Sequence, residues 1–277
     1  MPIITVSRGT MSGGKAVAER LAAALSCSCI AREVLVEGAA KLGVSEEFLR
    51  ERLQRAPGLW ERLTAERKTY ALATQAALAE HVARGDAVYH GLAGHLLLRE
   101  IPQVLRVRLI APLEIRVRAL MEQRSMTRED AERFIAQVDS HRVRWTRLMY
   151  DADIEDPRLY DLVLNLEKIS VESASDVVLE MARKPEFAID DAARTRLADF
   201  VVACRVRLAL AIQPASRGLD LEVTARNGTV TLTGKVPKPD MLTHASDRWM
   251  TELRQVVEGV AGVKRVILDV GVVSAYH

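Results

Sequence analysis

The sequence is poor in the residues that mark several classes of protein. Its 277 residues include three cysteines, Cys27, Cys29 and Cys204, and the two separated by one residue fit neither a zinc knuckle nor a Cys-x-x-Cys redox pair. Aromatic residues make up 4% of the chain, which leaves few platforms for stacking single-stranded nucleic acid. No apolar run reaches membrane-spanning length. The N-terminal segment has no signal-peptide pattern, so we expect a cytoplasmic protein.

Basic and acidic residues are present in nearly equal numbers. The 39 basic side chains (Lys and Arg) stand against 37 acidic ones, for a formal net charge of +2. With charges this evenly balanced, the protein has no strong net positive potential to attract nucleic acid. We therefore expect no nucleic-acid partner. Hydrophobic residues make up 49% of the chain, which is typical of a globular protein. The length allows two domains, each with a core of its own.

The most informative motif lies at the N-terminus. A β-branched run, residues 3–6, meets a glycine-rich loop of the form Gly-x-x-x-x-Gly-Lys, and an alanine-rich helical pattern follows at once. This strand–loop–helix order is the one that a P-loop needs, because the glycines and the helix start turn backbone N–H groups toward a phosphate. ATP with Mg²⁺ is the expected ligand. The candidate binding residues are Gly9, Thr10, Met11, Ser12, Gly13, Gly14, Lys15 and Ala16.

The motif has one defect. A P-loop normally carries Ser or Thr after the lysine to hold Mg²⁺, and here Ala16 and Val17 follow Lys15. Thr10, Ser12 or a carboxylate elsewhere could take that role, and the sequence does not decide among them. The simpler alternative is an ordinary glycine-rich turn between a strand and a helix. The histidines show no metal-ligand spacing, and we assign no residue as a metal ligand.

The first two thirds of the chain alternate strands with helices. This order predicts an α/β fold, a parallel sheet with helices on both faces and ligands at the carboxyl ends of the strands. The expected strands are residues 3–6, 27–30, 87–90, 104–111 and 160–165. The expected helices include residues 14–26, 45–56, 59–84, 127–149 and 170–183.

A change of pattern follows Lys184-Pro185-Glu186. A helix over 190–212 precedes two alternating runs joined by Asn227-Gly228, the strongest short-range signal for a β-hairpin. A second helix and a last strand complete the order α-β-β-α-β, which predicts helices on a small three-stranded sheet. We therefore expect two domains, residues 1–184 and 189–277.

Residues 1 to about 184 resemble the cytidylate kinase-like family of P-loop nucleotide kinases. The matching segments appear in the family's order and cover nearly the whole first domain. They are Ile4-Thr5-Val6-Ser7-Arg8, Ser12-Gly13-Gly14-Lys15, Arg32-Glu33, residues 97–107, Ala111-Pro112-Leu113-Glu114 with Arg116, Val138-Asp139 with Arg142, and residues 160–165.

The resemblance implies a role for several residues. Lys15 would bind the donor phosphates, while Arg32 and Gly91 would lie on the acceptor side. Asp139 and Arg142 fall in the segment that acts as a lid, where arginines neutralise the moving phosphoryl group and closure excludes water. Many members carry Gly-Arg-Gly after the third strand, and this chain has Leu92 in place of that arginine. An ion pair of Arg32 with Glu33 and a merely solvated lid helix stay open as structural alternatives.

Residues 189–277 resemble a BON domain. The resemblance rests on residues 221–236, which include the Asn227-Gly228 turn, and on the glycines and valines of residues 257–266. A BON domain is a small binding module, so it implies a small ligand or a protein partner. Two hypotheses follow for the whole chain. The first is ATP-dependent phosphoryl transfer to a nucleoside monophosphate or a related phosphate acceptor. The alternative is a catalytically impaired nucleotide-binding regulator that signals through its BON domain.

Overall fold

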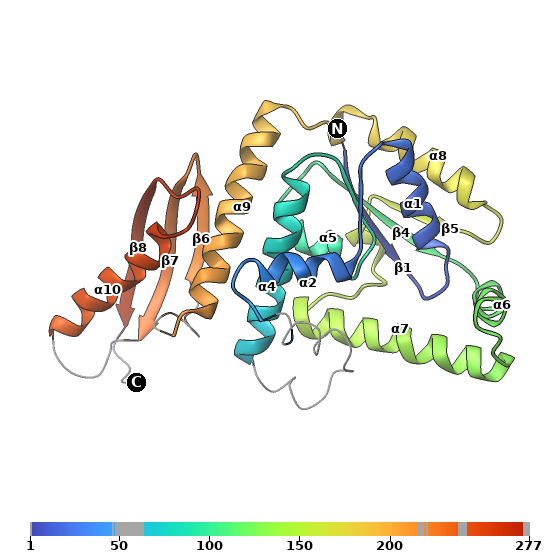
Figure 1. Cartoon of the computed structure of the whole chain (residues 1–277), viewed down its shortest axis with the longest axis horizontal. Coiled ribbons are helices and arrows are strands. Elements are labelled where there is room, and N and C mark those ends of the chain that lie inside the picture. The colour runs from blue at the N-terminus through green and yellow to red at the C-terminus, as the bar shows by residue number, and fades with distance from the viewer. Residues whose placement is uncertain are drawn as a thin grey trace.

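The computed structural model describes residues 2–45, 47, 64–214, 216, 219, 221–237 and 243–273. The helix expected over 45–56 falls almost wholly outside these residues. The described chain forms two β-sheets, one of five strands and one of three. No helix in these ranges is both long and apolar enough to cross a membrane. Figure 1 shows the larger sheet and its helices beside the smaller sheet.

The larger sheet is parallel throughout, as the alternation of strands and helices predicts. Its strand order is β2-β3-β1-β4-β5, so the strand that precedes the glycine-rich loop lies in the middle. β1 has a hydrogen-bonded strand on each side, and every residue from Ile3 to Ser7 is buried. The strands are β1 (Ile3–Arg8), β2 (Ser28–Ile30), β3 (Ala87–Tyr89), β4 (Val104–Ile110) and β5 (Leu162–Asn165).

Alternate residues of β1 enter two different cores. Ile4 and Val6 pack with α1 (Gly14–Ala24) and α8 (Val171–Ala182) on one face of the sheet. Ile3 packs on the other face, where α2 (Arg32–Ala40), α4 (Thr64–Val82) and α5 (Gly94–Leu97) lie. The side-chain period of two in a strand produces this division. The result is the three-layer arrangement of helices, sheet and helices that an α/β fold requires.

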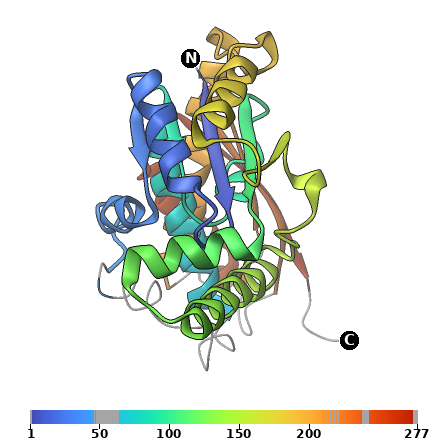
Figure 2. The ribbon, with the colours of Figure 1, turned by 90° about the vertical axis from the view of Figure 1, so that its right-hand side faces the viewer.

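Two helices cross the carboxyl ends of the strands. α6 (Leu113–Arg124) follows β4 and turns into the long α7 (Arg128–Tyr150). The side chain of Thr127 caps α7 by accepting a hydrogen bond from the amide of Asp130, as its capping pattern predicts. The α6–α7 hairpin has a small core of its own. In Figure 2, both helices lie at the end of the molecule to which the β1 arrow points.

The C-terminal part has the predicted order of elements. β6 (Leu221–Arg226) and β7 (Thr229–Pro237) are antiparallel, and β8 (Arg265–Val273) pairs with β7 in parallel. Asn227 and Gly228, which join β6 to β7, both have positive φ, 51° and 81°. These values are those of the tight hairpin turn that an Asn-Gly pair favours. α10 (Thr243–Glu258) packs on this sheet.

α9 (Asp191–Ile212) belongs to two cores at once. One set of its side chains, Leu197, Phe200, Val201, Cys204 and Leu208, is buried with α4 in the core of the larger sheet. Another set, Val202, Ala203, Val206 and Leu210, is buried against the smaller sheet. Figure 1 shows α9 standing between α4 and β6. The helix is thus apolar on two sides, as a helix enclosed by two layers must be.

Ion pairs reinforce this junction. Arg207 forms a bidentate pair with Glu100 at 2.7 and 3.0 Å and donates a further hydrogen bond to the carbonyl of Val223 in β6. Arg205 pairs with Glu80 of α4 and also donates to the carbonyl of Ala261. Two neighbouring arginines of α9 therefore each bind both parts of the chain.

We expect Phe200→Ala to destabilise the whole chain, because the ring is 5% exposed between α9 and α4. Removing a buried Phe side chain costs about 3–5 kcal/mol. Urea denaturation followed by circular dichroism would measure the loss. Arg196→Ala, at an exposed position of the same helix, is the control and should change the free energy of unfolding by less than about 0.5 kcal/mol. Equal stability of the two variants would contradict the shared-core role of α9.

Candidate functional site

The loop between β1 and α1 presents an open helix start. Gly13 is the N-cap residue of α1 and has φ of 79°, a left-handed conformation that glycine adopts without strain. No side chain caps the helix, so the amides of its first turn keep their hydrogen-bonding capacity. A Cβ at Gly14 would collide with the side chain of Arg8, which packs across the loop. This arrangement leaves uncapped N–H groups beside a guanidinium, and both attract anions.

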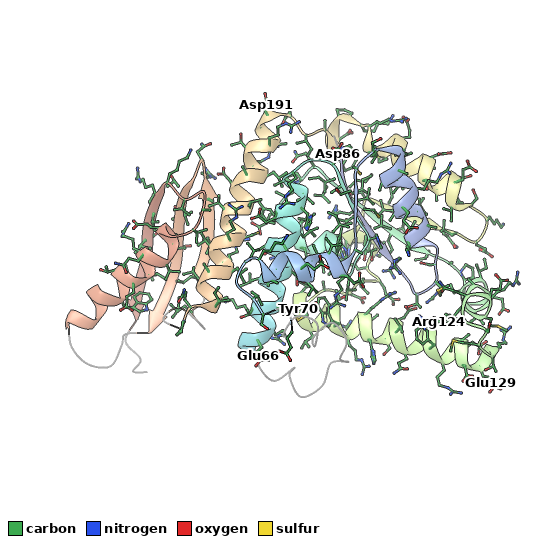
Figure 3. All side chains as sticks on the ribbon, in the orientation of Figure 1. Glu66, Tyr70, Asp86, Arg124, Glu129 and Asp191 are labelled. Atoms are coloured by element: carbon green, nitrogen blue, oxygen red, sulfur yellow. The ribbon has the colours of Figure 1, made fainter. Side chains whose placement is uncertain are left out.

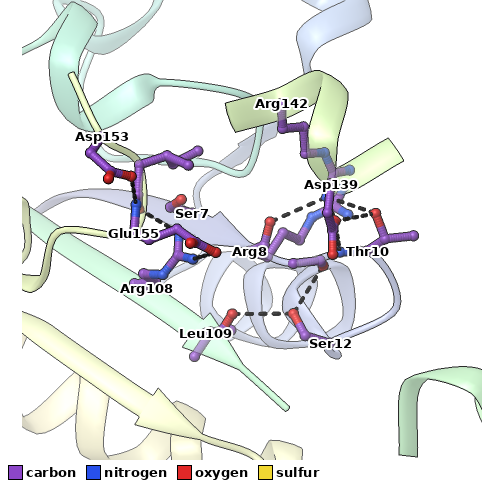
Figure 4. Close-up of polar contacts among 12 residues, drawn as sticks. Ser7, Arg8, Thr10, Ser12, Arg108, Leu109, Asp139, Arg142, Asp153 and Glu155 are labelled. Atoms are coloured by element: carbon purple, nitrogen blue, oxygen red, sulfur yellow. Dashed lines mark hydrogen bonds and ion pairs between the residues drawn. The ribbon is translucent and has the colours of Figure 1, made fainter. Parts of the chain in front are cut away.

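The α6–α7 hairpin is bonded directly to this loop. Asp139 of α7 accepts hydrogen bonds from the amide of Thr10 at 3.0 Å and from its hydroxyl at 2.7 Å. Arg116 of α6 donates to the carbonyl oxygen of Thr10 at 2.7 Å and pairs with Asp139. Arg142 donates to the carbonyl of Arg8 at 3.2 Å and to the hydroxyl of Thr10 at 3.1 Å. Figure 4 shows the contacts that Asp139 and Arg142 make with Thr10.

Met11 adds an apolar contact to the same junction. Its φ is 62°, an unfavourable value for a residue with a side chain. The side chain packs against the core of the α6–α7 hairpin, which contains Val117, Leu120, Ala131 and Ile135. The packing therefore offsets the backbone strain at Met11.

A pocket of about 120 Å³ lies beside this junction, and arginines dominate its lining. Four guanidinium groups, from Arg8, Arg108, Arg116 and Arg142, face two carboxylates, from Asp139 and Glu155. Whole-ligand pockets usually measure about 300–1,000 Å³. A pocket of this size and charge accordingly fits a phosphoryl group better than a whole nucleotide.

The charge in this pocket is not fully compensated. Burial, with smaller contributions from the nearby Arg8, Arg116 and Arg32, lowers the pKa of Arg142 to about 10 against the opposing effect of Asp139. Burial also lowers the pKa of Arg8, and its Nε is a buried donor with no hydrogen-bond partner in the described part of the chain. A cluster of desolvated cations with an unused donor is stabilised by an anion, and a phosphate group supplies both charge and acceptors.

The two loop hydroxyls are already engaged. Ser12 is 2% exposed, and its hydroxyl lies 3.0 Å from the carbonyl oxygen of Gly9 and 3.2 Å from that of Leu109. The hydroxyl of Thr10 donates to Asp139. Neither residue thus takes over the missing hydroxyl after Lys15 in this conformation. Among the described residues, no group of three or more His, Cys, Asp or Glu side chains could hold a metal ion.

Lys15 and Ala16 lie on the outer side of the loop. The Lys15 side chain is 69% exposed, and its Nζ is 3.6 Å from Glu19 one turn further along α1. It does not line the arginine pocket. A long, exposed lysine can swing toward a ligand at the helix start, but the structure brings together Gly9, Thr10, Asp139 and Arg142 and leaves Lys15 apart.

The two residues expected on the acceptor side have different surroundings. Arg32 begins α2 and donates two hydrogen bonds to the hydroxyl of Tyr70. Gly91 lies against Tyr89, whose hydroxyl occupies the space that a Cβ would need. Close packing therefore accounts for the glycine without a ligand. Leu92 is partly buried and packs on the core of the larger sheet.

Sequence reasoning gave no role to several residues of the site. Arg8 and Arg116 were part of matching segments, but nothing in the pattern distinguished them from surface arginines. Nothing in the sequence pattern assigns Trp145 to the site, yet the centroid of its ring lies 5.2 Å from the Arg32 guanidinium carbon. A usable signal existed for Arg8 and Arg108, because both lie at the carboxyl ends of adjacent strands, where ligands of parallel sheets bind.

Comparison with known proteins finds similarity in the first part of the chain. The sequence profile of the cytidylate kinase-like family matches residues 3–168. A cytidylate kinase from Methanosarcina barkeri (strain Fusaro / DSM 804) is 34% identical over 79 residues, which cover 28% of this chain and 43% of that protein. The chain therefore spans less than half the length of this curated relative.

Among solved structures, an uncharacterized protein from Eubacterium ventriosum ATCC 27560 superposes with a TM-score of 0.53 at 18% identity, covering 65% of this chain and 97% of that one. This likeness concerns the fold. A shikimate kinase from Acinetobacter baumannii has a TM-score of 0.37 at 14% identity, covering 65% and 92% of the two chains, which is too low to carry an argument. The parallel sheet with helices on both faces is the arrangement that the resemblance to this family implies.

Asp139 should make the stability of this junction depend on pH. Burial raises the pKa of its carboxyl group, but the hydrogen bonds from Thr10 and the pair with Arg116 outweigh burial, so the pKa lies below 3.8. A carboxyl whose pKa is lower in the folded state stabilises the protein above its unfolded pKa, and this contribution is lost as the pH falls through the folded value.

We therefore expect Asp139→Ala to lower the free energy of unfolding by about 2 kcal/mol at pH 7, the scale of a charge-assisted hydrogen bond. The difference from the unaltered protein should shrink below about pH 4. Urea denaturation at both pH values would measure it. The exposed Glu129→Ala, on the same helix, provides the control. A difference that persisted unchanged at pH 3 would show that the charge of Asp139 does not hold the hairpin to the loop.

Proposed function

This chain belongs to the cytidylate kinase-like family, and we propose that it transfers the terminal phosphoryl group of ATP to a nucleoside monophosphate or a related phosphate acceptor. Membership of the family supports a phosphotransferase of the P-loop kinase type. The observation that carries the proposal is the arginine pocket beside an uncapped helix start, because positioning and charge neutralisation supply most of the catalysis in phosphoryl transfer.

Each part of the site has a role in this proposal. The amides at the start of α1 and the side chain of Lys15 bind the donor phosphates, with Gly9 to Ala16 forming the loop around them. Arg142 and Arg8 neutralise the phosphoryl group as it moves. Asp139 holds Thr10 and Arg116 in place. Arg32 binds the acceptor phosphate, and Gly91 lines the acceptor side.

Mg²⁺ would enter with the nucleotide in this proposal. It neutralises charge on the outer phosphates when bound. Because Ala16 and Val17 carry no hydroxyl and the hydroxyls of Thr10 and Ser12 are engaged, its other ligands would be waters and phosphate oxygens, a set that Mg²⁺ accepts readily.

The alternative is a nucleotide-binding regulator with impaired turnover. The absence of a hydroxyl at Ala16 and Val17 favours this alternative, and Leu92 removes one charge from the acceptor side. In both cases we propose that residues 189–277 form a BON-like module that binds a small ligand or a protein partner, joined to the kinase-like part, residues 1–184. Because ATP is its proposed substrate, we place the protein in the cytoplasm.

The two hypotheses differ in turnover. With ATP, Mg²⁺ and a panel of nucleoside monophosphates, we expect acceptor-dependent release of ADP in a coupled assay. Lys15→Ala and Arg142→Ala should each reduce kcat by about 100-fold, the usual effect of removing one group that stabilises transition-state charge.

Arg133→Ala is the matched control, because Arg133 lies on α7 with its side chain 73% exposed and paired only with Asp130 at 3.4 Å in the described chain. It should keep normal activity. ATP binding in a calorimeter without ADP release for any acceptor would favour the regulator. Normal turnover of Arg142→Ala would refute the role given to the arginine pocket.

A further inference from the structure

Arg32 is held by two aromatic side chains, and we call Arg32, Tyr70 and Trp145 the Arg32 cluster. The Nε and Nη2 groups of Arg32 donate hydrogen bonds to the Tyr70 hydroxyl at 3.3 and 2.7 Å. The guanidinium carbon lies 5.2 Å from the centroid of the Trp145 ring, within range of a cation–π interaction. The two rings are nearly perpendicular, with centroids 6.1 Å apart. These contacts fix the position and the plane of the guanidinium group.

None of these contacts neutralises Arg32. Its contacts within the described chain are to a phenol oxygen and to aromatic rings, and no carboxylate there lies within ion-pair distance. The ion pair with Glu33 that the sequence left open is not formed. A guanidinium has five N–H donors, and Tyr70 accepts only two of them. Among the residues that the structure describes, Arg32 therefore keeps its charge and most of its donors for a ligand.

The two aromatic residues are rigid supports. Tyr70 is 2% exposed on α4, and Trp145 is 7% exposed on α7. Both belong to the core of the larger sheet, and Figure 3 places Tyr70 on α4 beside the C-terminal end of α7. Side chains locked by packing hold a binding group more accurately than exposed ones do. The support of Arg32 is therefore part of the folded core, not of the surface.

α7 connects this cluster with the donor loop. Trp145 follows Arg142 by three positions, so both side chains lie on adjoining parts of one helix face. Arg142 contacts the loop, and Trp145 contacts Arg32. One helix thus contacts the residues proposed for the donor and for the acceptor.

We propose that Tyr70 and Trp145 are positioning residues that fix Arg32 for the phosphate of a nucleoside monophosphate. The identity of this ligand rests on the proposed function. Leu92, which packs on the same core, leaves the acceptor side without the arginine that the family pattern carries there. The affinity for the acceptor phosphate consequently depends on how accurately Arg32 is held.

The test is Tyr70→Phe, which keeps the ring and removes the oxygen that accepts both hydrogen bonds. Tyr150→Phe is the matched control, because Tyr150 packs on Trp145 with ring centroids 5.6 Å apart and its buried hydroxyl has no hydrogen-bond partner in the described chain. We expect the KM for CMP to rise about tenfold in Tyr70→Phe, the effect of weakening one charge-assisted contact. The KM for ATP and the melting temperature should stay unchanged, and Tyr150→Phe should keep all three values.

Calorimetric titration with CMP, without ATP, separates this inference from the proposed function. Binding should weaken about tenfold in Tyr70→Phe and in Trp145→Leu, and should be lost in Arg32→Ala. This result in a protein that releases no ADP would support the positioning role and refute the kinase. Unchanged CMP affinity in Tyr70→Phe would overturn the positioning role even in an active kinase. Failure of CMP, AMP, GMP and UMP to bind the unaltered protein would also overturn it.

Discussion

The site depends on one carboxylate placed among arginines. Asp139 accepts two hydrogen bonds from Thr10 and pairs with Arg116, and Arg142 lies 3.6 Å away. Without this negative charge, four guanidinium groups would surround one small pocket and repel one another. The carboxylate neutralises only part of that charge, so the hairpin can lie on the loop while the pocket still attracts an anion. The negative charge of a nucleotide phosphate would thus neutralise the guanidinium charge that Asp139 leaves uncompensated.

The two parts of the chain are joined by buried apolar contacts and by ion pairs. α9 buries one side against α4 and the other against the small sheet, and its arginines pair with residues of the larger part. A linker that merely tethered a binding module would be polar and exposed. Because α4 also carries Tyr70, whose hydroxyl contacts Arg32, the C-terminal module packs against a helix that supports the acceptor side. Spatial proximity alone does not establish coupling, but a ligand of the proposed BON-like module would have a short physical path to the site.

The elements of the fold could be predicted from the sequence because their signals are local. The capping residues Thr127 and Asp190 begin the helices that they predict, and Asn227-Gly228 adopts the positive φ values of its turn. The position of α9 between the cores of the two sheets could not be predicted. A helix that is apolar on two sides shows no single hydrophobic face in its sequence pattern. Which arginines serve the site was equally hidden. Arg133 and Arg142 are both on α7, and only the fold leaves Arg133 exposed and partly buries Arg142 beside the loop.

The placement of Lys15 follows from the same electrostatics. Its ammonium group is well hydrated and near Glu19, and moving it toward Arg8 and Arg142 without an intervening anion would add a further positive charge to the pocket. A polyphosphate at the start of α1 reverses that balance, because each phosphate oxygen attracts the lysine as well as the arginines. The exposed lysine is therefore the conformation expected of a ligand-free loop, and its position does not by itself distinguish an active kinase from a nucleotide sensor. What distinguishes them is whether Arg142 of α7 and Arg32, which α7 contacts through Trp145, are correctly spaced for two phosphates at once.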